Sequence, residues 1–224
     1  MIPWTLLDSA QVPGDGGEIR LYQRGSEYSI RVGSYELMNN RVHGSEDALA
    51  SIACARLSDR DAARVLVGGL GMGFTLAGVL KDCGPRSEVV VAELVPAVVT
   101  WNRGPLGAFA GDPLNDARVT VRERDVAEVI RAERGGFDAI LLDVDNGPAG
   151  LTSAANDRLY SPSGVRAAYI ALRPGGILAV WSAGPHHPFM RRLQQTGFEA
   201  EEVRVRGRGV AGGSRFLIWI ARRT

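Results

Sequence analysis

The chain of 224 residues lacks the features that mark membrane, secreted and nucleic-acid-binding proteins. No apolar run approaches the about 20 residues that a membrane-spanning helix needs. The 26 basic and 25 acidic residues nearly cancel, so charge gives no reason to expect a nucleic-acid partner. Asp8, Glu18 and Arg20 interrupt the apolar positions near the N-terminus, so we expect no signal peptide. These absences predict a cytoplasmic protein with no membrane or nucleic-acid partner.

Cysteine and histidine are also scarce. The two cysteines, Cys54 and Cys83, lie far apart and outside any metal-ligand spacing, so we expect buried thiols rather than a disulfide framework. His186 and His187 are adjacent, and adjacent residues rarely bind one metal together. No cysteine or third histidine stands near them, so an exposed loop is a better prediction than a metal pair or a general base. We therefore expect no metal cofactor.

The first 44 residues have the pattern of a small β appendage. Glu18–Gln23 and Tyr28–Val32 alternate apolar and polar residues, and the short turn between them predicts a β-hairpin. Tyr35–Met38 is a candidate third strand. A piece this small is marginal alone, so we expect residues 1–44 to pack on the main domain or on another subunit. A homodimer is predicted on this ground.

From Ser45 onward, helices and strands alternate. Ser45 is the predicted N-cap of a helix over Ala48–Leu57. Five short apolar strands follow, separated by helices, and this alternation predicts a mostly parallel sheet with helices on both faces. The predicted strands are Arg64–Val67, Glu88–Ala92, Val119–Arg122, Ala139–Leu142 and Ile177–Trp181.

The C-terminal end of the chain has a different pattern. Ala200–Val205 and Ser214–Ala221 are predicted strands joined by a glycine-rich turn. A parallel sheet that finishes with an antiparallel hairpin favours the seven-stranded Rossmann-like methyltransferase fold over the two matched halves of a dinucleotide dehydrogenase. Residues 45–224 are therefore predicted to form one α/β nucleotide-binding domain.

A glycine-rich loop follows the first strand of this domain. Its glycines are Gly68, Gly69, Gly71 and Gly73. Glycines let a ligand lie against bare backbone, and the following helix adds N–H groups and its positive dipole end. Close helix–strand packing alone is the competing explanation. The dinucleotide pattern G-x-G-x-x-G fails, because it requires glycine at Phe74 or Leu76, so an S-adenosyl nucleotide is favoured over NAD.

Two carboxylates stand where the next two strands end. Glu93 follows Gly73 by twenty residues, and a carboxylate at this position accepts hydrogen bonds from both ribose hydroxyls of a nucleotide. Asp125 is placed to accept a hydrogen bond from an adenine amino group or to N-cap the following helix, and both roles stay open. We expect Leu94 and Val126 to line the same cofactor site.

The fourth strand ends in a second acidic cluster. Asp143 and Asp145 come just past the apolar stretch that ends at Leu142. Chemistry in open α/β sheets gathers beyond the carboxyl ends of the strands. Asp143 and Asp145 are therefore the predicted catalytic residues, which would hold an amine and take up its proton, with Asp143 also facing the cofactor. The alternative is a turn whose acids bond only to the backbone.

Together these motifs resemble the spermidine/spermine synthase family of aminopropyltransferases. The resemblance runs from about Ile19 to Ser182 and includes the β-rich N-terminus, the glycine loop and Glu93. Its most specific part is the strand ending at Asp143 before Gly147-Pro148-Ala149. The resemblance implies binding of decarboxylated S-adenosylmethionine and transfer of its aminopropyl group to a diamine, without metal, in polyamine biosynthesis.

The chain departs from the family pattern in three places. Family members carry an acid within the glycine loop that grips the aminopropyl ammonium, and Gly71 stands there in this chain. The family's Tyr-His-Glu run in the helix before the domain is replaced by Leu49-Ala50-Ser51. The loop after Asp143 is shorter, so Asp145 and Asn146 compete for the second acidic position.

Three functions follow from the motifs and the departures. The leading hypothesis is a spermidine synthase-like transferase that uses S-adenosylmethionine or its decarboxylated form and an amine acceptor. An S-adenosylmethionine-dependent methyltransferase is the second, and the glycine at Gly71 makes it more plausible. A non-catalytic relative that only binds the nucleotide is the third.

Overall fold

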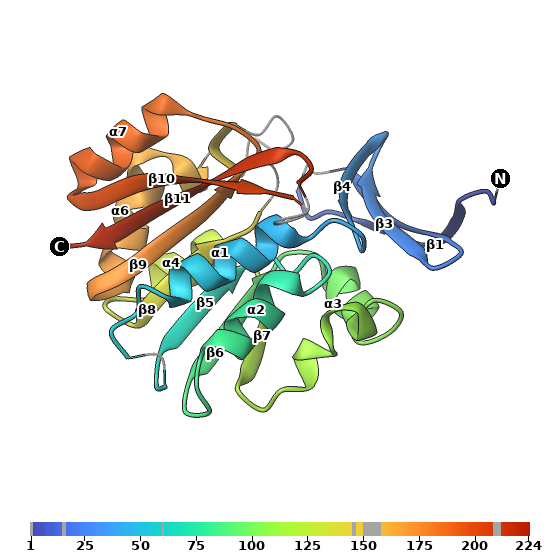
Figure 1. The fold of residues 1–224 in the computed structure, drawn as a ribbon, viewed down its shortest axis with the longest axis horizontal. Helices are drawn as coiled ribbons and strands as arrows, with labels where there is room; N and C mark the ends of the chain where they lie inside the picture. The colour runs from blue at the N-terminus through green and yellow to red at the C-terminus, as the bar shows by residue number, and fades with distance from the viewer. Residues whose placement is uncertain (1, 15–16, 60, 145–146, 150–157, 208–211) are drawn as a thin grey trace.

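The computed structural model describes residues 2–14, 17–59, 61–144, 147–149, 158–207 and 212–224. Figure 1 shows two sheets, a small one near the N-terminus and a larger one that carries the helices. Asp145 and Asn146, predicted to compete for one acidic position, lie outside the described residues.

The small sheet is antiparallel and has four strands in the order β1-β2-β3-β4. The strands are β1 (Thr5–Gln11), β2 (Glu18–Arg24), β3 (Glu27–Val32) and β4 (Tyr35–Asn39). The predicted hairpin and third strand are present, but β1 was not predicted, because its largely exposed residues do not alternate apolar with polar. Ile19, Leu21 and Ile30 are buried in the same apolar cluster as the helices of the large domain. The small sheet therefore packs on the large domain.

The large sheet has seven strands in the order β10-β11-β9-β8-β5-β6-β7. They are β5 (Arg64–Gly68), β6 (Glu88–Glu93), β7 (Val119–Glu123), β8 (Phe137–Leu142), β9 (Leu172–Ser182), β10 (Phe198–Arg206) and β11 (Arg215–Arg223). The first five are parallel, and β11 pairs antiparallel with both β9 and β10. This topology confirms the predicted Rossmann-like methyltransferase fold.

Helices cover both faces of this sheet (Figure 1). The helices are α1 (Gly44–Cys54), α2 (Phe74–Asp82), α3 (Pro96–Asn102), α4 (Val126–Ala132), α6 (Pro162–Ala171) and α7 (His187–Thr196), with 3-10 turns η1 (Gly107–Ala110), η2 (Pro113–Asn115) and η3 (Gly147–Ala149). Successive strand residues point to opposite faces, so Val65 and Val67 pack with α1–α3 whereas Leu66 packs with α4 and α6. Full burial on both faces explains why these strands are continuously apolar.

The start of α1 differs from the prediction. The helix begins at Gly44 with His43 at the N-cap, so Ser45 lies inside the first turn and is not the cap. The Gly44 N–H donates to the Gly207 carbonyl at 2.8 Å, and the His43 ring stacks on Phe74 with 4.1 Å between centroids. These tertiary contacts set the helix start, and local sequence does not reveal them.

Two other boundaries also differ. The strand expected to begin at Ile177 begins five residues earlier, at Leu172. His187 is the first residue of α7 and His186 is its N-cap, so the pair opens a helix rather than occupying a loop. None of the helices in the described part of the chain combines the length and apolar character needed to span a bilayer.

Candidate functional site

The glycine loop connects β5 to α2 at the carboxyl edge of the large sheet. Gly69, Gly71 and Gly73 have φ angles of 86°, 53° and 83°, in the left-handed region that favours glycine. A Cβ on Gly69 would lie 2.4 Å from the Asp143 carbonyl oxygen. At Gly68 a Cβ would lie 2.6 Å from Val126 Cγ2, so this glycine serves close packing.

The Gly69→Ala variant is expected to be destabilised by more than the about 1–3 kcal/mol of left-handed backbone strain, because its Cβ also collides with Asp143. The matched control is Gly135→Ala, which has φ +57 and no atom within 4 Å of the added Cβ. Denaturant unfolding of both variants measures the difference. A Gly69→Ala protein as stable as the Gly135→Ala protein would contradict this packing.

Glu93 ends β6 and faces the glycine loop. Its side chain is 8% exposed. One carboxylate oxygen accepts the Leu70 N–H at 2.9 Å, and the other accepts the Val95 N–H at 2.8 Å. The structure thus brings Glu93 to the loop as expected. Leu94, the residue between Glu93 and Val95, is partly buried. Two backbone donors fix the carboxylate orientation before any ligand arrives.

Asp125 and Val126 lie one strand further along. Asp125 Oδ1 accepts the Ala127 N–H at 2.8 Å, so Asp125 is the N-cap of α4. Val126 is buried and packs against Gly68. The capping role of Asp125 is confirmed, and its contact with an adenine amino group stays a prediction.

Asp143 lies at the carboxyl end of β8, beside the glycine loop. Its N–H donates to the Gly68 carbonyl at 2.9 Å, and the Thr75 hydroxyl donates to Asp143 Oδ2 at 2.6 Å. Loss of hydration raises the pKa of Asp143 to about 6, and the Thr75 bond opposes that shift. A carboxyl group with this pKa exchanges its proton close to neutral pH.

The sequence did not identify Glu46, a second carboxyl group at the site. Glu46 lies in the first turn of α1, is 8% exposed and accepts a hydrogen bond from the Ser45 hydroxyl at 2.6 Å. Burial and then the nearby charge of Asp143 raise the pKa of Glu46 to about 7. Because the two acids interact, they titrate as a pair that holds a proton near neutral pH.

The sequence indicates only weakly that the Glu46 side chain is buried at the site. The stretch Ser45-Glu46-Asp47 is typical of a helix start, where acids complement the helix dipole. The family's Tyr-His-Glu run was placed at Leu49-Ala50-Ser51, yet the acid that α1 supplies, Glu46, lies five residues before Ser51. Asp47 points to solvent and contacts His43 Nδ1 at 2.9 Å.

An aromatic pair lies on the other side of Asp143. In the β8–β9 register, Leu141 is opposite Ala179 and Leu142 is opposite Val180. Continuing this register places Asp143 beside Trp181, with both side chains on the face toward α1. The Trp181 ring is partly exposed and packs against Phe216 with centroids 5.0 Å apart. At this edge of the sheet, the carboxyl groups of Asp143 and Glu46 lie toward α1, and the rings of Trp181 and Phe216 lie toward β11.

Two residues hold the glycine loop from outside. The Asn102 side-chain amide donates to the carbonyls of Gly71 at 2.8 Å and Val98 at 2.9 Å. Met38, from β4 of the small sheet, accepts the Met72 N–H at 3.1 Å and would lie 2.9 Å from a Cβ on Gly71. The small sheet thus contributes to the site, and an uncharged thioether lies against Gly71.

The histidine pair follows the carboxyl end of β9. His186 is partly buried, and burial together with the nearby Arg192 and His187 charges lowers its pKa. Among the described residues, no group of three or more His, Cys, Asp or Glu side chains could hold a metal ion.

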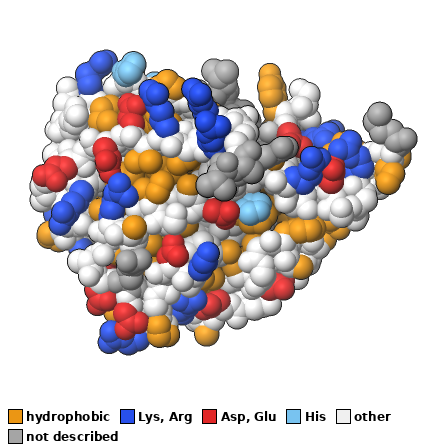
Figure 2. Space-filling view, in the orientation of Figure 1, with side chains coloured by type: hydrophobic (Ala, Val, Ile, Leu, Met, Phe, Trp, Pro, Cys, Tyr) orange, Lys and Arg blue, Asp and Glu red, His pale blue; other side chains and the backbone are white. Residues whose placement is uncertain are grey.

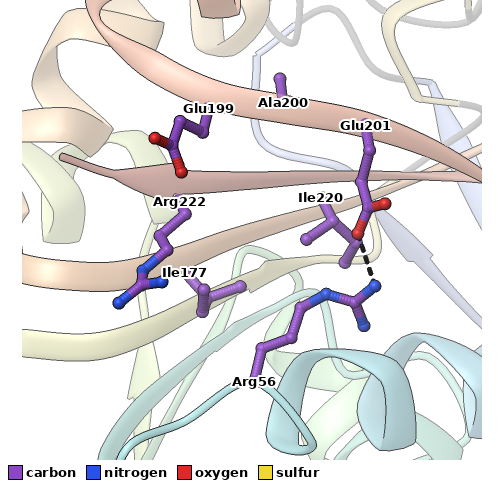
Figure 3. A pocket seen from close by; sticks show the side chains of 7 residues that line it. All are labelled: Arg56, Ile177, Glu199, Ala200, Glu201, Ile220 and Arg222. Carbon is purple, nitrogen blue, oxygen red and sulfur yellow. Dashed lines mark hydrogen bonds and ion pairs between the residues drawn. The ribbon is translucent and has the colours of Figure 1, made fainter.

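A groove lies away from this edge of the sheet. Its volume is about 430 Å³, and the side chains of Ile177, which pairs with Ala139 near the amino end of β8, and Ile220 form its apolar floor (Figure 3). Its rim carries an Arg56–Glu201 ion pair of 2.5 Å. On the face shown in Figure 2, apolar side chains gather here between acidic and basic ones, and neither sign dominates. Asp143 and Glu93 lie at the opposite ends of the strands.

Comparisons with known proteins agree with this geometry. No family model matches the chain, and no curated protein is detectably similar to it in sequence. Spermidine synthase from Thermotoga maritima superposes with a TM-score of 0.78 at 18% identity, over 98% of this chain and 73% of that one. A spermidine synthase in complex with the transition state analogue AdoDATO superposes with a TM-score of 0.77 at 17% identity, over 98% and 72%. The chain has the fold of the spermidine synthases.

This fold extends to methyltransferases. TrmN from Thermus thermophilus superposes with a TM-score of 0.57 at 21% identity, over 80% of this chain and 48% of that one. The spermidine synthase structures match nearly the whole chain, the small N-terminal sheet included. The predicted resemblance to spermidine synthases is therefore confirmed at the level of the fold.

Proposed function

We propose that the chain is a spermidine synthase-like transferase that binds S-adenosylmethionine or its decarboxylated form and transfers an aminopropyl group to an amine. The observation that carries the proposal is the carboxyl pair of Glu46 and Asp143, placed beside the glycine loop. Two acids whose pKa values are raised toward neutrality suit a site that must hold an amine and accept its proton.

The donor half of the site is the glycine loop with Glu93. The bare backbone of Gly69 packs closely against the Asp143 carbonyl, and the Glu93 carboxylate is already oriented by two N–H groups. In the proposed complex, Glu93 accepts the ribose hydroxyls, Leu94 and Val126 line the site, and Asp125 accepts from the adenine amino group. The residues present therefore fit an S-adenosyl nucleotide, and the proposal includes no metal.

The acceptor half lies between α1 and β9. The bound donor supplies a sulfonium, which is a good leaving group. Asp143 and Glu46 hold the amine as its nitrogen forms the new N–C bond, the C–S bond breaks, and the amine proton passes to Asp143. Trp181 and Phe216 provide an apolar wall for the rest of the acceptor.

Labelled donors test the reaction directly. The chain is incubated with diamines and monoamines and with either the decarboxylated donor labelled in its aminopropyl group or the intact donor labelled in its methyl group. We expect the aminopropyl label in the amine product. Tight donor binding without transfer of either label across the amine panel would instead support a non-catalytic nucleotide-binding protein.

Methyl transfer is the second candidate, and the contact at Gly71 favours it. Met38 lies where the loop acid of spermidine synthases is expected, so the structure offers a thioether at that point in place of a counter-charge for an aminopropyl ammonium. An unpaired ammonium would cost about 1–3 kcal/mol. Transfer of the methyl label in the same assay would decide for this alternative.

The Asn102→Ala variant is expected to weaken donor binding by about tenfold, because the carbonyls of Gly71 and Val98 lose their donor and the loop loses its anchor. Calorimetric titration measures the affinity, and circular dichroism monitors the fold. Asn115→Ala in η2 is the control, with unchanged affinity expected. Equal donor affinity in the Asn102→Ala and wild-type proteins would show that the loop does not need this anchor.

A homodimer and a cytoplasmic role in polyamine biosynthesis are part of the same proposal. The four-stranded sheet exposes Leu6, Leu7 and Tyr35, and such a surface suits contact with a second copy. Size-exclusion chromatography with light scattering tests the oligomeric state, and the mass of a single chain would exclude the dimer.

A further inference from the structure

The two cysteines, far apart in the sequence, meet in the core. Cys54 is the last residue of α1, and Cys83 directly follows α2. Both side chains are buried, at 0% and 5% exposure, and their Sγ atoms lie 3.6 Å apart. A disulfide requires an S–S distance of about 2.05 Å. The two thiols are therefore in contact, and a small shift of the two helix ends would bring the Sγ atoms to bonding distance.

The packing of α1 on α2 holds the thiols in this position. A Cβ on Gly78 would lie 2.6 Å from Ala50 Cβ, so the two helices make a close approach there. Both helices begin at the carboxyl edge of the sheet, where they supply Glu46 and Thr75, and both end at the cysteine pair. The thiols thus lie at the far ends of two helices whose first turns form part of the proposed site.

A positive charge accompanies Cys83. The Arg118 guanidinium donates to the carbonyls of Cys83 at 2.8 Å and Leu80 at 2.9 Å. The pKa of Arg118 is raised, chiefly by its hydrogen bond with Asp116 and to a lesser degree by the Cys83 thiol. A neighbouring cation favours the thiolate, the nucleophilic form of cysteine. Cys83 is also the more exposed of the two, so it is the thiol expected to react first.

We propose that Cys54 and Cys83 form a redox modification site, which a peroxide converts reversibly into an α1–α2 disulfide. The Cys83 thiolate attacks one peroxide oxygen, the O–O bond breaks, and Cys83 becomes a sulfenic acid as one water leaves. The Cys54 thiol then attacks the Cys83 sulfur, and a second water leaves as the S–S bond forms. Two thiols and one hydrogen peroxide thus give one disulfide and two waters.

The disulfide would join the two helices by a covalent bond at the ends opposite the site. It would also close a loop containing β5, the glycine loop and α2, and such a constraint on the unfolded chain stabilises the native state. We therefore expect the oxidised protein to melt several degrees above the reduced one. This inference goes beyond the proposed transferase activity and does not depend on it.

The test treats the intact, reduced protein with a small excess of hydrogen peroxide and then measures its mass and its thiols under denaturing conditions. The expected result is a mass decrease of about 2 Da, loss of both thiols, and recovery of both by dithiothreitol. The melting temperature should rise on oxidation and return on reduction.

Cys54→Ala is the control variant, because it keeps Cys83 and removes its partner. It should gain about 16 or 32 Da, as Cys83 proceeds to sulfenic and sulfinic acid, with no reversible rise in melting temperature. A wild-type protein that keeps both thiols under these conditions, or gains oxygen instead of losing hydrogen, would overturn the proposal. The wild-type measurement decides even if the variant folds poorly.

Discussion

Asp143→Asn is expected to lower turnover by about 10²–10⁴-fold while affinity for the S-adenosyl donor changes only a few-fold. Asparagine keeps the size of the side chain and still accepts the Thr75 hydrogen bond, but it cannot take a proton from the amine. The donor contacts of the glycine loop and Glu93 remain in place. Steady-state kinetics with the accepted amine, beside calorimetric titration of the donor, separates the two effects.

The matched control is Asp138→Asn, the same substitution at the other end of β8. Asp138 lies near the amino end of β8, where it accepts the Arg64 N–H at 2.8 Å and pairs with Arg173 at 2.6 Å. We expect this variant to lose some stability and to keep its turnover. An Asp143→Asn enzyme as active as the control would remove Asp143 from the reaction.

Glu46→Gln is expected to change how stability depends on pH and to leave the midpoint of the pH–rate profile near 6. The charge of Asp143 raises the pKa of Glu46, whereas burial raises the pKa of Asp143 itself, so removal of Glu46 should leave the pKa of Asp143 unchanged. If Asp143 is the base, activity rises with pH through its pKa, and this rise should be the same in the variant and the wild type.

The stability of the folded state, unlike the activity midpoint, should depend on Glu46. Folding raises the pKa of Glu46 from 4.5 to about 7, so the native state binds more protons than the unfolded state between these values. Stability therefore falls as pH rises through this range, by on the order of 2–3 kcal/mol for this group. The Glu46→Gln protein should show a flatter curve between pH 5 and pH 8.

Asp47→Asn provides the control for the pH experiments. Asp47 is the next residue of the same helical turn, but it is exposed and faces His43. We expect nearly the wild-type pH dependence in this variant, because the charge of Asp47 is the smallest of the influences on the pKa of Glu46. Urea unfolding from pH 5 to pH 8 measures all three proteins, and identical slopes for wild type and Glu46→Gln would contradict the buried pair.

The sheet and the glycine loop were predictable because their signals are local. A parallel strand buried on both faces must be apolar throughout, and Val65–Val67 and Ile140–Leu142 show this directly. Turns that need positive φ select glycine, and this requirement is visible at Gly69. The carboxyl ends of parallel strands meet at one edge, so Glu93 and Asp143 could be assigned to one site before any coordinates.

The contribution of α1 was not predictable because it depends on contacts between distant segments. Nothing in the local sequence indicates that His43 stacks on Phe74 or that Gly44 bonds to Gly207, yet these contacts begin the helix at Gly44 and accompany the burial of Glu46. Asn102 and Met38 reach the glycine loop in the same way, from elements distant in sequence. The meeting of Cys54 and Cys83 is a further case.

The most direct test of the central claim is a calorimetric titration with decarboxylated S-adenosylmethionine, S-adenosylmethionine and NAD in parallel. The account predicts binding of the S-adenosyl compounds, with preference for the decarboxylated form and none for NAD. Preference for the intact form would direct the search to methyl transfer. If neither S-adenosyl compound binds the folded protein, the proposed transferase activity is wrong and only the fold assignment stands.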